Sequence, residues 1–313
     1  QKISVALIYA SAYGNTATVG QAIASGLTKA GIGVESINCE VAQPEEIQAA
    51  VERCAGFIIG SPTLGGHAPT QIQTALGIIL SSADKSKPAG VFGSFGWSGE
   101  AIDLLESKLR NGGYQLAFET IRVKFKPTET TLKTCEEIGT DFAQEIKLSK
   151  KFRPPTQPAS NTEQAVGRII GSLCVLAAQQ GEVTSGMLAS WVSQATFDPP
   201  GLTVAVAKDR AVESLTHIGD RFTLNILAEG RSIRKKFMKK FSPGEDRFAG
   251  LETEEGENGC PIIKEALAYL ECTVSDRMEC GDHWVIYSTI DCGNVLLPDG
   301  QTAVHHRKSG SHY

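Results

Sequence analysis

The stretch ISVALIY (3–9), followed at once by ASAYGNT (10–16), decides how the first half of the chain folds. Its seven mostly apolar residues predict a buried strand, and the polar turn after them leads into a helix-like stretch over 17–30. Gly14 allows a sharp turn, and a helix that begins near Thr16 points its free N–H groups and positive dipole end at that turn. The stretch therefore predicts a phosphate site at the carboxyl end of a strand.

The same alternation of strand and helix continues to residue 148. Because strands that alternate with helices form crossover units, the first half is predicted to be a doubly wound α/β fold, with a parallel sheet covered on both faces. The predicted strands cover 3–9, 33–38, 55–61, 89–95 and 114–123, and the predicted helices cover 17–30, 44–54, 70–82, 99–111 and 130–148.

Two further loops leave the carboxyl ends of later strands. GSPTLGGHAP (60–69) and GSFGWSGEA (93–101) combine Gly and Ser with an apolar side chain, which suits a flat ring held by backbone amides and covered by Leu64 or Trp97. No Lys or Arg lies between Lys2 and Lys29, and no P-loop motif is present. A phosphate monoester held by neutral donors indicates flavin mononucleotide (FMN) more than a nucleoside triphosphate.

A proline-rich segment then separates two domains. SKKFRPPTQPASNT (149–162) has no apolar periodicity and reads as a linker. We expect a first domain over 1–148, a linker over 149–161 and a second domain over 162–313. In the second domain strands are predicted to follow one another closely, as in an antiparallel sheet or closed barrel. They cover 172–180, 183–196, 202–208, 221–227, 268–279 and 283–297, and helices are expected near 162–171, 210–217 and 231–241.

The composition excludes several classes of protein. Residues 1–150 hold 13 Lys and Arg against 15 Asp and Glu, and 151–313 hold 17 against 20, so neither half has the basic excess of a nucleic-acid binder. No apolar run is long enough for a membrane span, and no signal peptide opens the chain. The eight cysteines lie far apart, which favours reduced thiols in a cytoplasmic protein. The absence of an initiator Met suggests a fragment or a processed form.

The first domain resembles a flavodoxin, in the version found in flavodiiron proteins, through SAYGNT, GSPT and FGSFGWSGEA. The resemblance implies that the first loop binds the FMN phosphate and that the other two loops line the isoalloxazine ring. The implied phosphate contacts are Ser11, Tyr13, Gly14, Asn15 and Thr16, and the implied ring contacts are Pro62, Thr63, Leu64, Gly65, Ser94, Phe95, Gly96, Trp97, Ser98 and Gly99.

The second domain resembles the flavin reductase family, a split β-barrel, through ASWVSQATFDPPGLTVAV (189–206), FTLNIL (222–227) and CGDHWVIYSTID (280–291). The resemblance implies a second flavin, FMN or FAD, and a nicotinamide coenzyme, with His283 near the reacting rings. A histidine that is only hydrogen-bonded within its strand explains His283 equally well. The implied flavin contacts are Ser190, Trp191, Val192, Ser193, Gln194 and Asn225.

Taken together, the two domains resemble the carboxyl-terminal part of a class C flavodiiron protein of cyanobacterial type, without the metallo-β-lactamase-like diiron domain. This resemblance implies an NAD(P)H:flavin oxidoreductase that relays electrons to FMN and supplies oxygen reduction at the diiron centre of the full-length family. No metal site is expected in this chain. A homodimer, or a heterodimer with another flavodiiron subunit, is expected as well.

Two alternatives remain open. The second domain would be a partner-binding barrel if the chain were a non-catalytic FMN carrier, and a quinone reductase of flavodoxin type would explain the first domain alone. The basic stretch RSIRKKFMKKF (231–241) reads first as an amphipathic helix with a solvated face. It would otherwise dock an acidic partner or hold the extra phosphate of NADPH. The histidines of AVHHRKSGSHY (303–313) lack metal-ligand spacing and read as a polar tail.

Overall fold

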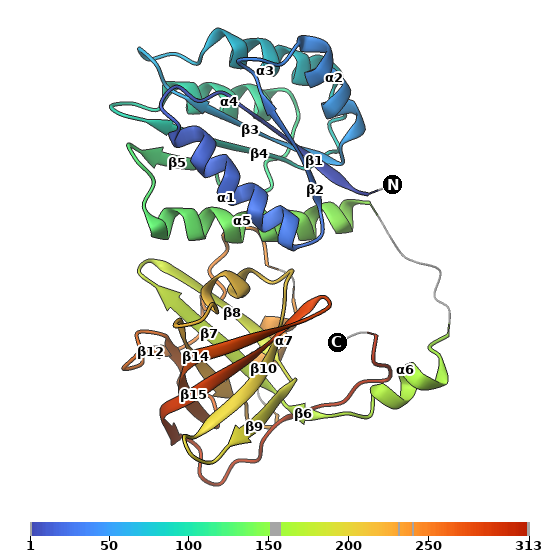
Figure 1. Cartoon of the computed structure of the whole chain (residues 1–313), viewed down its shortest axis with the longest axis vertical. Coiled ribbons are helices and arrows are strands. Elements are labelled where there is room, and N and C mark those ends of the chain that lie inside the picture. Colours follow the sequence, from blue (N-terminus) through green and yellow to red (C-terminus); the bar gives the residue numbers. More distant parts are fainter. Residues whose placement is uncertain (1, 151–157, 231, 240, 312–313) are drawn as a thin grey trace. The chain divides into compact units, whose positions relative to one another are not determined.

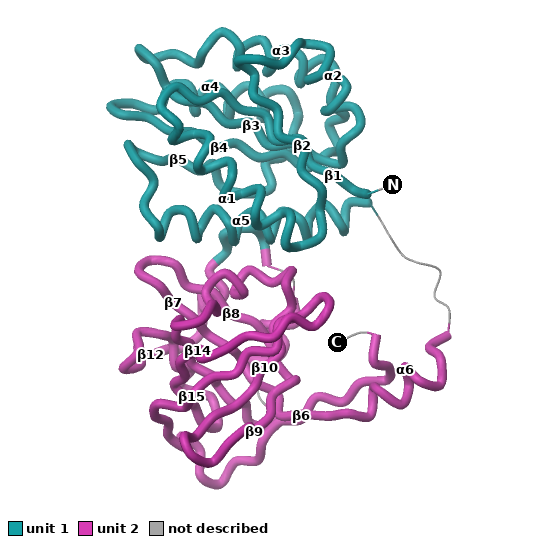
Figure 2. Tube along the Cα trace, in the orientation of Figure 1, with its two compact units in different colours: residues 1–152, 242–245 teal, residues 153–241, 246–313 magenta. Residues whose placement is uncertain are grey.

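The computed structural model describes residues 2–150, 158–230, 232–239 and 241–311 (Figure 1). The chain divides into two compact units, one made of residues 1–152 with 242–245 and the other of 153–241 and 246–313 (Figure 2). Most of the predicted linker, 151–157, lies outside the described residues. Within the described ranges, no helix has both the length and the apolar run that a bilayer crossing requires.

The first unit is a parallel five-stranded sheet in the order β2-β1-β3-β4-β5, as predicted for a doubly wound fold. Its strand order reverses between β1 and β3, so the loops after these strands open a crevice at the carboxyl edge of the sheet. The strands are β1 (Ser4–Tyr9), β2 (Gly33–Asn38), β3 (Gly56–Pro62), β4 (Ala89–Phe95) and β5 (Ile121–Lys124), and the helices are α1 (Asn15–Lys29), α2 (Pro44–Arg53), α3 (Thr70–Ser82), α4 (Glu100–Asn111) and α5 (Glu129–Ser149).

Helices cover both faces of this sheet. One apolar cluster joins it to α2, α3 and α4, and a second joins the other face to α1 and α5. The helices α1 and α5 approach each other through glycines, because a Cβ on Gly26 would lie 2.0 Å from the carbonyl oxygen of Glu136. A Cβ on Gly139 would likewise lie 2.2 Å from the carbonyl oxygen of Ile23. Glycines at this crossing therefore let the backbones of α1 and α5 approach each other closely.

The second unit is built on an antiparallel seven-stranded sheet in the order β8-β7-β11-β14-β15-β10-β9. One of its apolar clusters takes residues from all seven strands, as expected for a flavin reductase-like barrel. The strands of this sheet are β7 (Cys174–Gln180), β8 (Val183–Ala189), β9 (Val192–Thr196), β10 (Gly201–Ala207), β11 (Arg221–Ile226), β14 (Ala268–Cys280) and β15 (His283–Val295). Two short pairs complete the unit: β12 (Thr253–Glu255) with β13 (Pro261–Ile263), and β6 (Gly171–Ser172) with β16 (Val304–His305).

Several predicted boundaries of the second unit were wrong. The run 183–196 is two strands, because the chain bends at Ser190 and Trp191 and β8 and β9 then pair at opposite edges of the sheet. The helix expected over 162–171 is the short α6 (Asn161–Val166), and the one expected near 210–217 is a 3-10 turn, η1 (Ala211–Leu215). In the basic stretch, α7 covers Ile233–Met238, while residues 231 and 240 lie outside the described residues.

One strand of the first unit is also shorter than predicted. The sequence favoured a strand over 114–123, whereas β5 covers only Ile121–Lys124. Tyr114 instead lies buried, and its hydroxyl donates to the carbonyl oxygens of Ile79 and Ala83 at 2.9 and 2.6 Å. Anchoring this side chain at the end of α3 draws the segment away from a regular ladder.

Candidate functional site

The loop between β1 and α1 has the geometry of an anion site. Gly14 precedes the helix with φ 82°, the left-handed conformation that glycine adopts without strain. The first turn of α1 contains no acidic residue. The Ser11 hydroxyl accepts a hydrogen bond from the Ala17 amide at 3.3 Å, while no backbone bond is recorded for the amides of Asn15 and Thr16 within the described residues. These amides and the helix dipole together favour a negative group here.

A buried pair of hydroxyl groups ties the first loop to the end of β4. Thr16 Oγ1 and Ser94 Oγ are 2.7 Å apart, and both residues are buried. Each hydroxyl satisfies the other, so the bond fixes the start of α1 against the loop that begins at Ser94. The distance between two of the predicted ligand-binding loops is therefore set by this contact.

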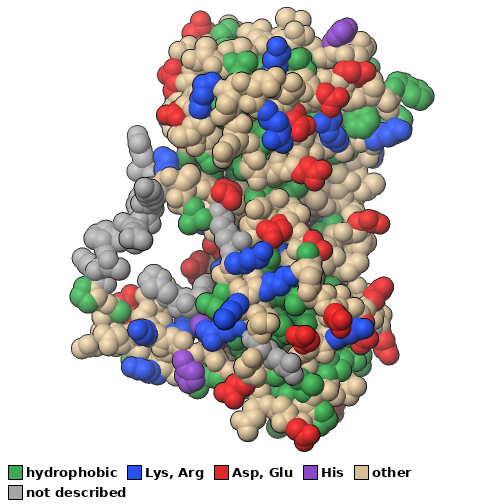
Figure 3. Space-filling model, turned by 180° about the vertical axis from the view of Figure 1, so that it is seen from behind, with side chains coloured by type: hydrophobic (Ala, Val, Ile, Leu, Met, Phe, Trp, Pro, Cys, Tyr) green, Lys and Arg blue, Asp and Glu red, His purple; other side chains and the backbone are tan. Residues whose placement is uncertain are grey.

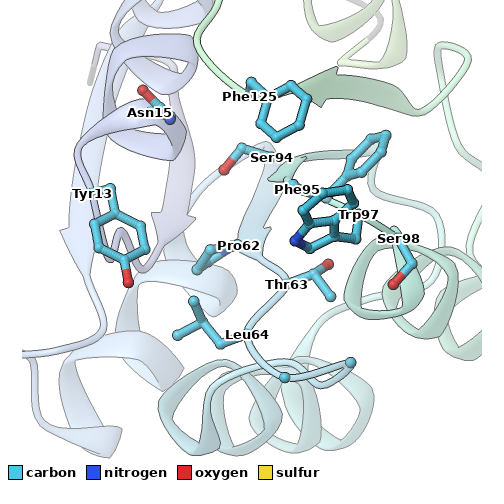
Figure 4. Close-up of a pocket in the computed structure, with 13 residues that line it drawn as sticks. Tyr13, Asn15, Pro62, Thr63, Leu64, Ser94, Phe95, Trp97, Ser98 and Phe125 are labelled. Atoms are coloured by element: carbon cyan, nitrogen blue, oxygen red, sulfur yellow. The ribbon is translucent and has the colours of Figure 1, made fainter.

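The three predicted loops line one pocket of about 780 Å³, a size typical of sites for small organic ligands. Tyr13 and Trp97 lie on opposite sides of it, with Pro62 and Leu64 between them (Figure 4). Both aromatic side chains are strongly exposed, at 87% and 93%. Two large, exposed rings facing one pocket provide surfaces on which a flat ring system can stack.

One polar atom in the wall of this pocket has no partner. The hydroxyl of Thr63 is buried and makes no hydrogen bond to any residue that the structure describes, whereas the hydroxyl of nearby Ser61 donates to the carbonyl oxygen of Pro62 at 2.8 Å. A buried polar group without a partner is costly, and a ligand that bonds to it removes that cost. The orphaned hydroxyl, the neutral first loop and the aromatic walls all fit a ligand with a flat polar ring and a phosphate.

Most of the predicted contacts of the first unit meet in this pocket, and four do not line it. Ser11, Gly14, Thr16 and Gly99 lie outside its wall, where Ser11 and Thr16 brace the loops through the bonds described above. A hydrogen bond from Ser98 lowers the pKa of Glu100 at the start of α4. The predicted residues that line the pocket are Tyr13, Asn15, Pro62, Thr63, Leu64, Gly65, Ser94, Phe95, Gly96, Trp97 and Ser98.

Two residues of the pocket were missed by the sequence analysis, Gly66 and Phe125. Phe125 follows β5 with φ 58°, a conformation that bulky residues rarely adopt. Its amide donates to the carbonyl oxygen of Phe95 at 2.8 Å, which holds the ring at the pocket edge. The one signal in the sequence was its place directly after a strand that ends at the same sheet edge.

In the second unit, two of the predicted residues stack on each other. The ring centroids of Trp191 and His283 are 4.7 Å apart with an interplanar angle of 34°, and Arg307 lies over Trp191 at 5.2 Å from the centroid. His283 Nδ1 lies 2.7 Å from Asp282 Oδ1, and this hydrogen bond lowers the pKa of Asp282. Residues from β15, the bend before β9 and the chain after β16 thus meet at one place.

Two other predicted residues of this unit, Val192 and Asn225, lie inside it. Along β9, side chains alternate, so Val192 packs against the barrel core and Ser193 points away from it. Asn225 is fully buried: its Nδ2 donates to the carbonyl oxygen of Pro261 at 3.2 Å, and its Oδ1 accepts from the Ile263 amide at 2.8 Å. These bonds hold the β13 segment, and a cofactor contact by Asn225 stays a prediction.

Two family models match the chain. A family model described as flavodoxin matches residues 7–139, and one described as flavin reductase like domain matches residues 166–310. The two matches define a flavoprotein composed of a flavodoxin domain and a flavin reductase-like domain. A flavodoxin domain implies FMN, and a flavin reductase-like domain implies flavin binding.

Whole-chain relatives carry the same pair of domains under one name. Diflavin flavoprotein A 6 of Nostoc sp. is 66% identical over 313 residues, which cover 99% of this chain and 55% of that protein. Diflavin flavoprotein A 1 of Synechocystis sp. is 46% identical over 312 residues, covering 99% and 54%. The solved metal-soaked flavodiiron core from Synechocystis sp. is 66% identical with a TM-score of 0.47, covering 48% of this chain and 37% of that one.

The chain is similar along nearly its whole length to cyanobacterial proteins named diflavin flavoprotein A. It spans about half the length of the curated relatives that it matches.

Proposed function

We propose that this chain is the electron-supply module of a flavodiiron protein, an NAD(P)H:flavin oxidoreductase that relays electrons through FMN. The observation that carries the proposal is the pocket of the first unit, in which neutral phosphate donors and facing aromatic rings meet beside an orphaned hydroxyl. The flavin reductase-like match over 166–310 supplies the second half of the proposal. The final acceptor would be the diiron centre of the flavodiiron family, where oxygen is reduced.

In the first unit the chain's own residues would bind and orient FMN. The amides of Asn15 and Thr16 would hold the phosphate, and Tyr13 and Trp97 would cover the ring system. The Thr63 hydroxyl would bond to a polar edge of that ring. Bound flavin would supply the redox chemistry, because it takes two electrons from a reduced nicotinamide and releases them singly. The protein would position the flavin and shield its ring from water with the aromatic side chains of the pocket.

In the second unit Trp191 and His283 would form the surface on which a coenzyme ring lies. Asp282 Oδ1 lies 2.7 Å from Nδ1 of His283 and would orient its imidazole. The role of His283 would be to orient and to donate a hydrogen bond, and no side-chain acid or base needs to change its charge during electron transfer.

Anaerobic titration of the FMN-loaded chain with NADH and with NADPH tests this proposal. Loss of the visible flavin absorbance of about two flavins per chain is expected, and the better donor identifies the coenzyme. Dithionite serves as the control that bound flavin can be reduced. If dithionite bleaches the flavin and neither coenzyme does, the reductase activity is ruled out, and the chain is an electron carrier that depends on another protein for its electrons.

A further inference from the structure

Two arginines from distant parts of the second unit converge on one histidine. Arg234 lies on α7, and its Nη2 is 3.4 Å from Nδ1 of His305 on β16. His305 is largely buried, and Arg307 follows it two residues later on the same segment. The pairing of β16 with β6 fixes the segment in place, because Val304 and His305 lie opposite Ser172 and Gly171. Both guanidinium charges thus act on the imidazole of His305, although they come from separate elements.

The positive charge of Arg234 is not balanced by an acid. Its side chain contacts the Met238 sulfur at 3.3 Å and the imidazole of His305, and no carboxylate in the described part of the chain pairs with it. Burial, together with the charges of Arg234 and Arg307, lowers the pKa of His305 and keeps its ring neutral. Because a neutral imidazole and a thioether do not compensate the charge of the Arg234 guanidinium, this group attracts an anion.

One of these arginines, Arg307, also contacts the aromatic pair of the second unit. Arg307 covers Trp191, which in turn lies on His283. Arg307 therefore brings a cationic group beside an aromatic pair, which suits a ligand that carries a phosphate next to a flat ring. Lys and Arg side chains gather on the face of the second unit shown in Figure 3. Lys235 of α7 and Lys239, the residue after that helix, are exposed to solvent.

We propose that Arg234 and Arg307, with His305 between them, form a binding site for the phosphate monoester of a coenzyme of the second unit. This inference rests on the proposed reductase function. Two planar guanidinium forks match the oxygens of a phosphate dianion better than point charges do. Two coenzymes carry such a group, NADPH on its ribose and FMN at the end of its ribityl chain, and each has a counterpart that lacks only the phosphate.

The test compares these matched pairs in the full chain. For wild type, Arg234→Gln and Arg307→Gln, kcat/KM is measured with NADPH and NADH, and the affinity of the second unit is measured for FMN and riboflavin. For one of the two ligand pairs, the preference of the protein for the ligand with the phosphate over the ligand without it is expected to fall by about tenfold in both arginine variants. Lys235→Gln, the matched control on the exposed side of α7, is expected to change neither preference by more than about twofold.

Which pair responds identifies the source of the phosphate. If both arginine variants keep the wild-type preference for NADPH over NADH and for FMN over riboflavin, the proposal is overturned. The basic surface would then remain as a docking site for an acidic protein. If wild type oxidises neither NADPH nor NADH, the proposed reductase function is refuted, but the phosphate site is not. The site is then tested by direct titration with 2′-AMP and FMN. Weaker binding in the arginine variants would then support the site, and no binding to wild type would refute it.

Discussion

The ring of Phe125 meets the indole of Trp97 edge-on, with centroids 6.4 Å apart and an interplanar angle of 83°. The two rings come from the loops after β5 and β4 and lie on the same side of the pocket (Figure 4). Phe125 reaches this position only with a backbone φ of 58°. The strained backbone of Phe125 lowers the stability of the fold, which suggests that this conformation is kept because it shapes the pocket.

Substitution of Phe125 separates the strain from the contact. Phe125→Ala and Phe125→Gly both remove the ring, so both are expected to weaken FMN binding about equally, by roughly fivefold. Only glycine tolerates the positive φ, so Phe125→Gly should have a free energy of unfolding about 1 kcal/mol higher than Phe125→Ala. Flavin fluorescence quenching and urea unfolding measure the two quantities. An alanine variant as stable as the glycine variant would show that the backbone is not strained.

The orphaned hydroxyl of Thr63 makes a second prediction. Thr63→Val keeps the shape of the side chain and removes a buried group that has no partner, so the free energy of unfolding without flavin should stay equal or rise by about 1 kcal/mol. FMN affinity should fall by roughly fivefold because a bond to the ligand is lost. Ser61→Ala is the control: its hydroxyl is bonded to Pro62, and its loss should lower stability. Unchanged FMN affinity in Thr63→Val would remove this residue from the site.

Much of the first unit was predictable because its local and global signals agree. Apolar runs of strand length, each followed by a Gly-rich turn and a helical period, lead to one sheet topology, and its carboxyl edge then collects the loops. Phe125 escaped prediction because nothing in the local sequence marks a phenylalanine for a left-handed conformation. Ser11 and Thr16 were predicted as ligand contacts. The Ser11 hydroxyl bonds to Ala17 of the same segment, and the Thr16 hydroxyl bonds to Ser94, a partner that becomes visible only once the two loops are placed together.

The second unit was less predictable because strands of a barrel pair over long distances. The run 183–196 is continuous in its pattern, but the bend at Trp191 sends its two halves to opposite edges of the sheet. Asn225 was inferred from family resemblance alone. Its burial among the backbone groups of Val175, Pro261 and Ile263 depends on β13, a three-residue strand that carries almost no periodic signal.

The structural setting of Asn225 can be tested directly. Asn225→Ala would leave the Ile263 amide and the Pro261 carbonyl group without their partner, so the free energy of unfolding should fall by about 2–3 kcal/mol. The KM for nicotinamide coenzyme in the folded variant should stay unchanged. Asn294→Ala, at an exposed position of β15, is the control and should change neither value. A raised KM with unchanged stability would instead support the cofactor contact that the resemblance implied.

The thiol of Cys292 donates to Oε2 of Glu271 at 2.9 Å. Glu271 is almost fully buried, and its Oε1 accepts from the Asn258 amide at 2.8 Å. The hydrogen bond to Glu271, followed by burial, raises the pKa of Cys292 to about 12. Because the thiolate is the reactive form, Cys292 should react slowly with alkylating agents despite its partial exposure.

Glu271→Gln should release this thiol. The amide oxygen can still accept from Asn258. The carboxylate that raises the pKa of Cys292 most is gone, while Glu257 remains 3.9 Å from its sulfur, so this pKa should fall from its raised value toward the ordinary one. Alkylation by iodoacetamide at pH 8 should then be at least about tenfold faster, which corresponds to one pKa unit. In wild type the rate should still climb with pH above pH 10, whereas the variant should level off earlier. Exposed Cys280 is the internal control, read by peptide mass spectrometry. Equal rates at Cys292 in the two proteins would mean that Glu271 does not hold the thiol protonated.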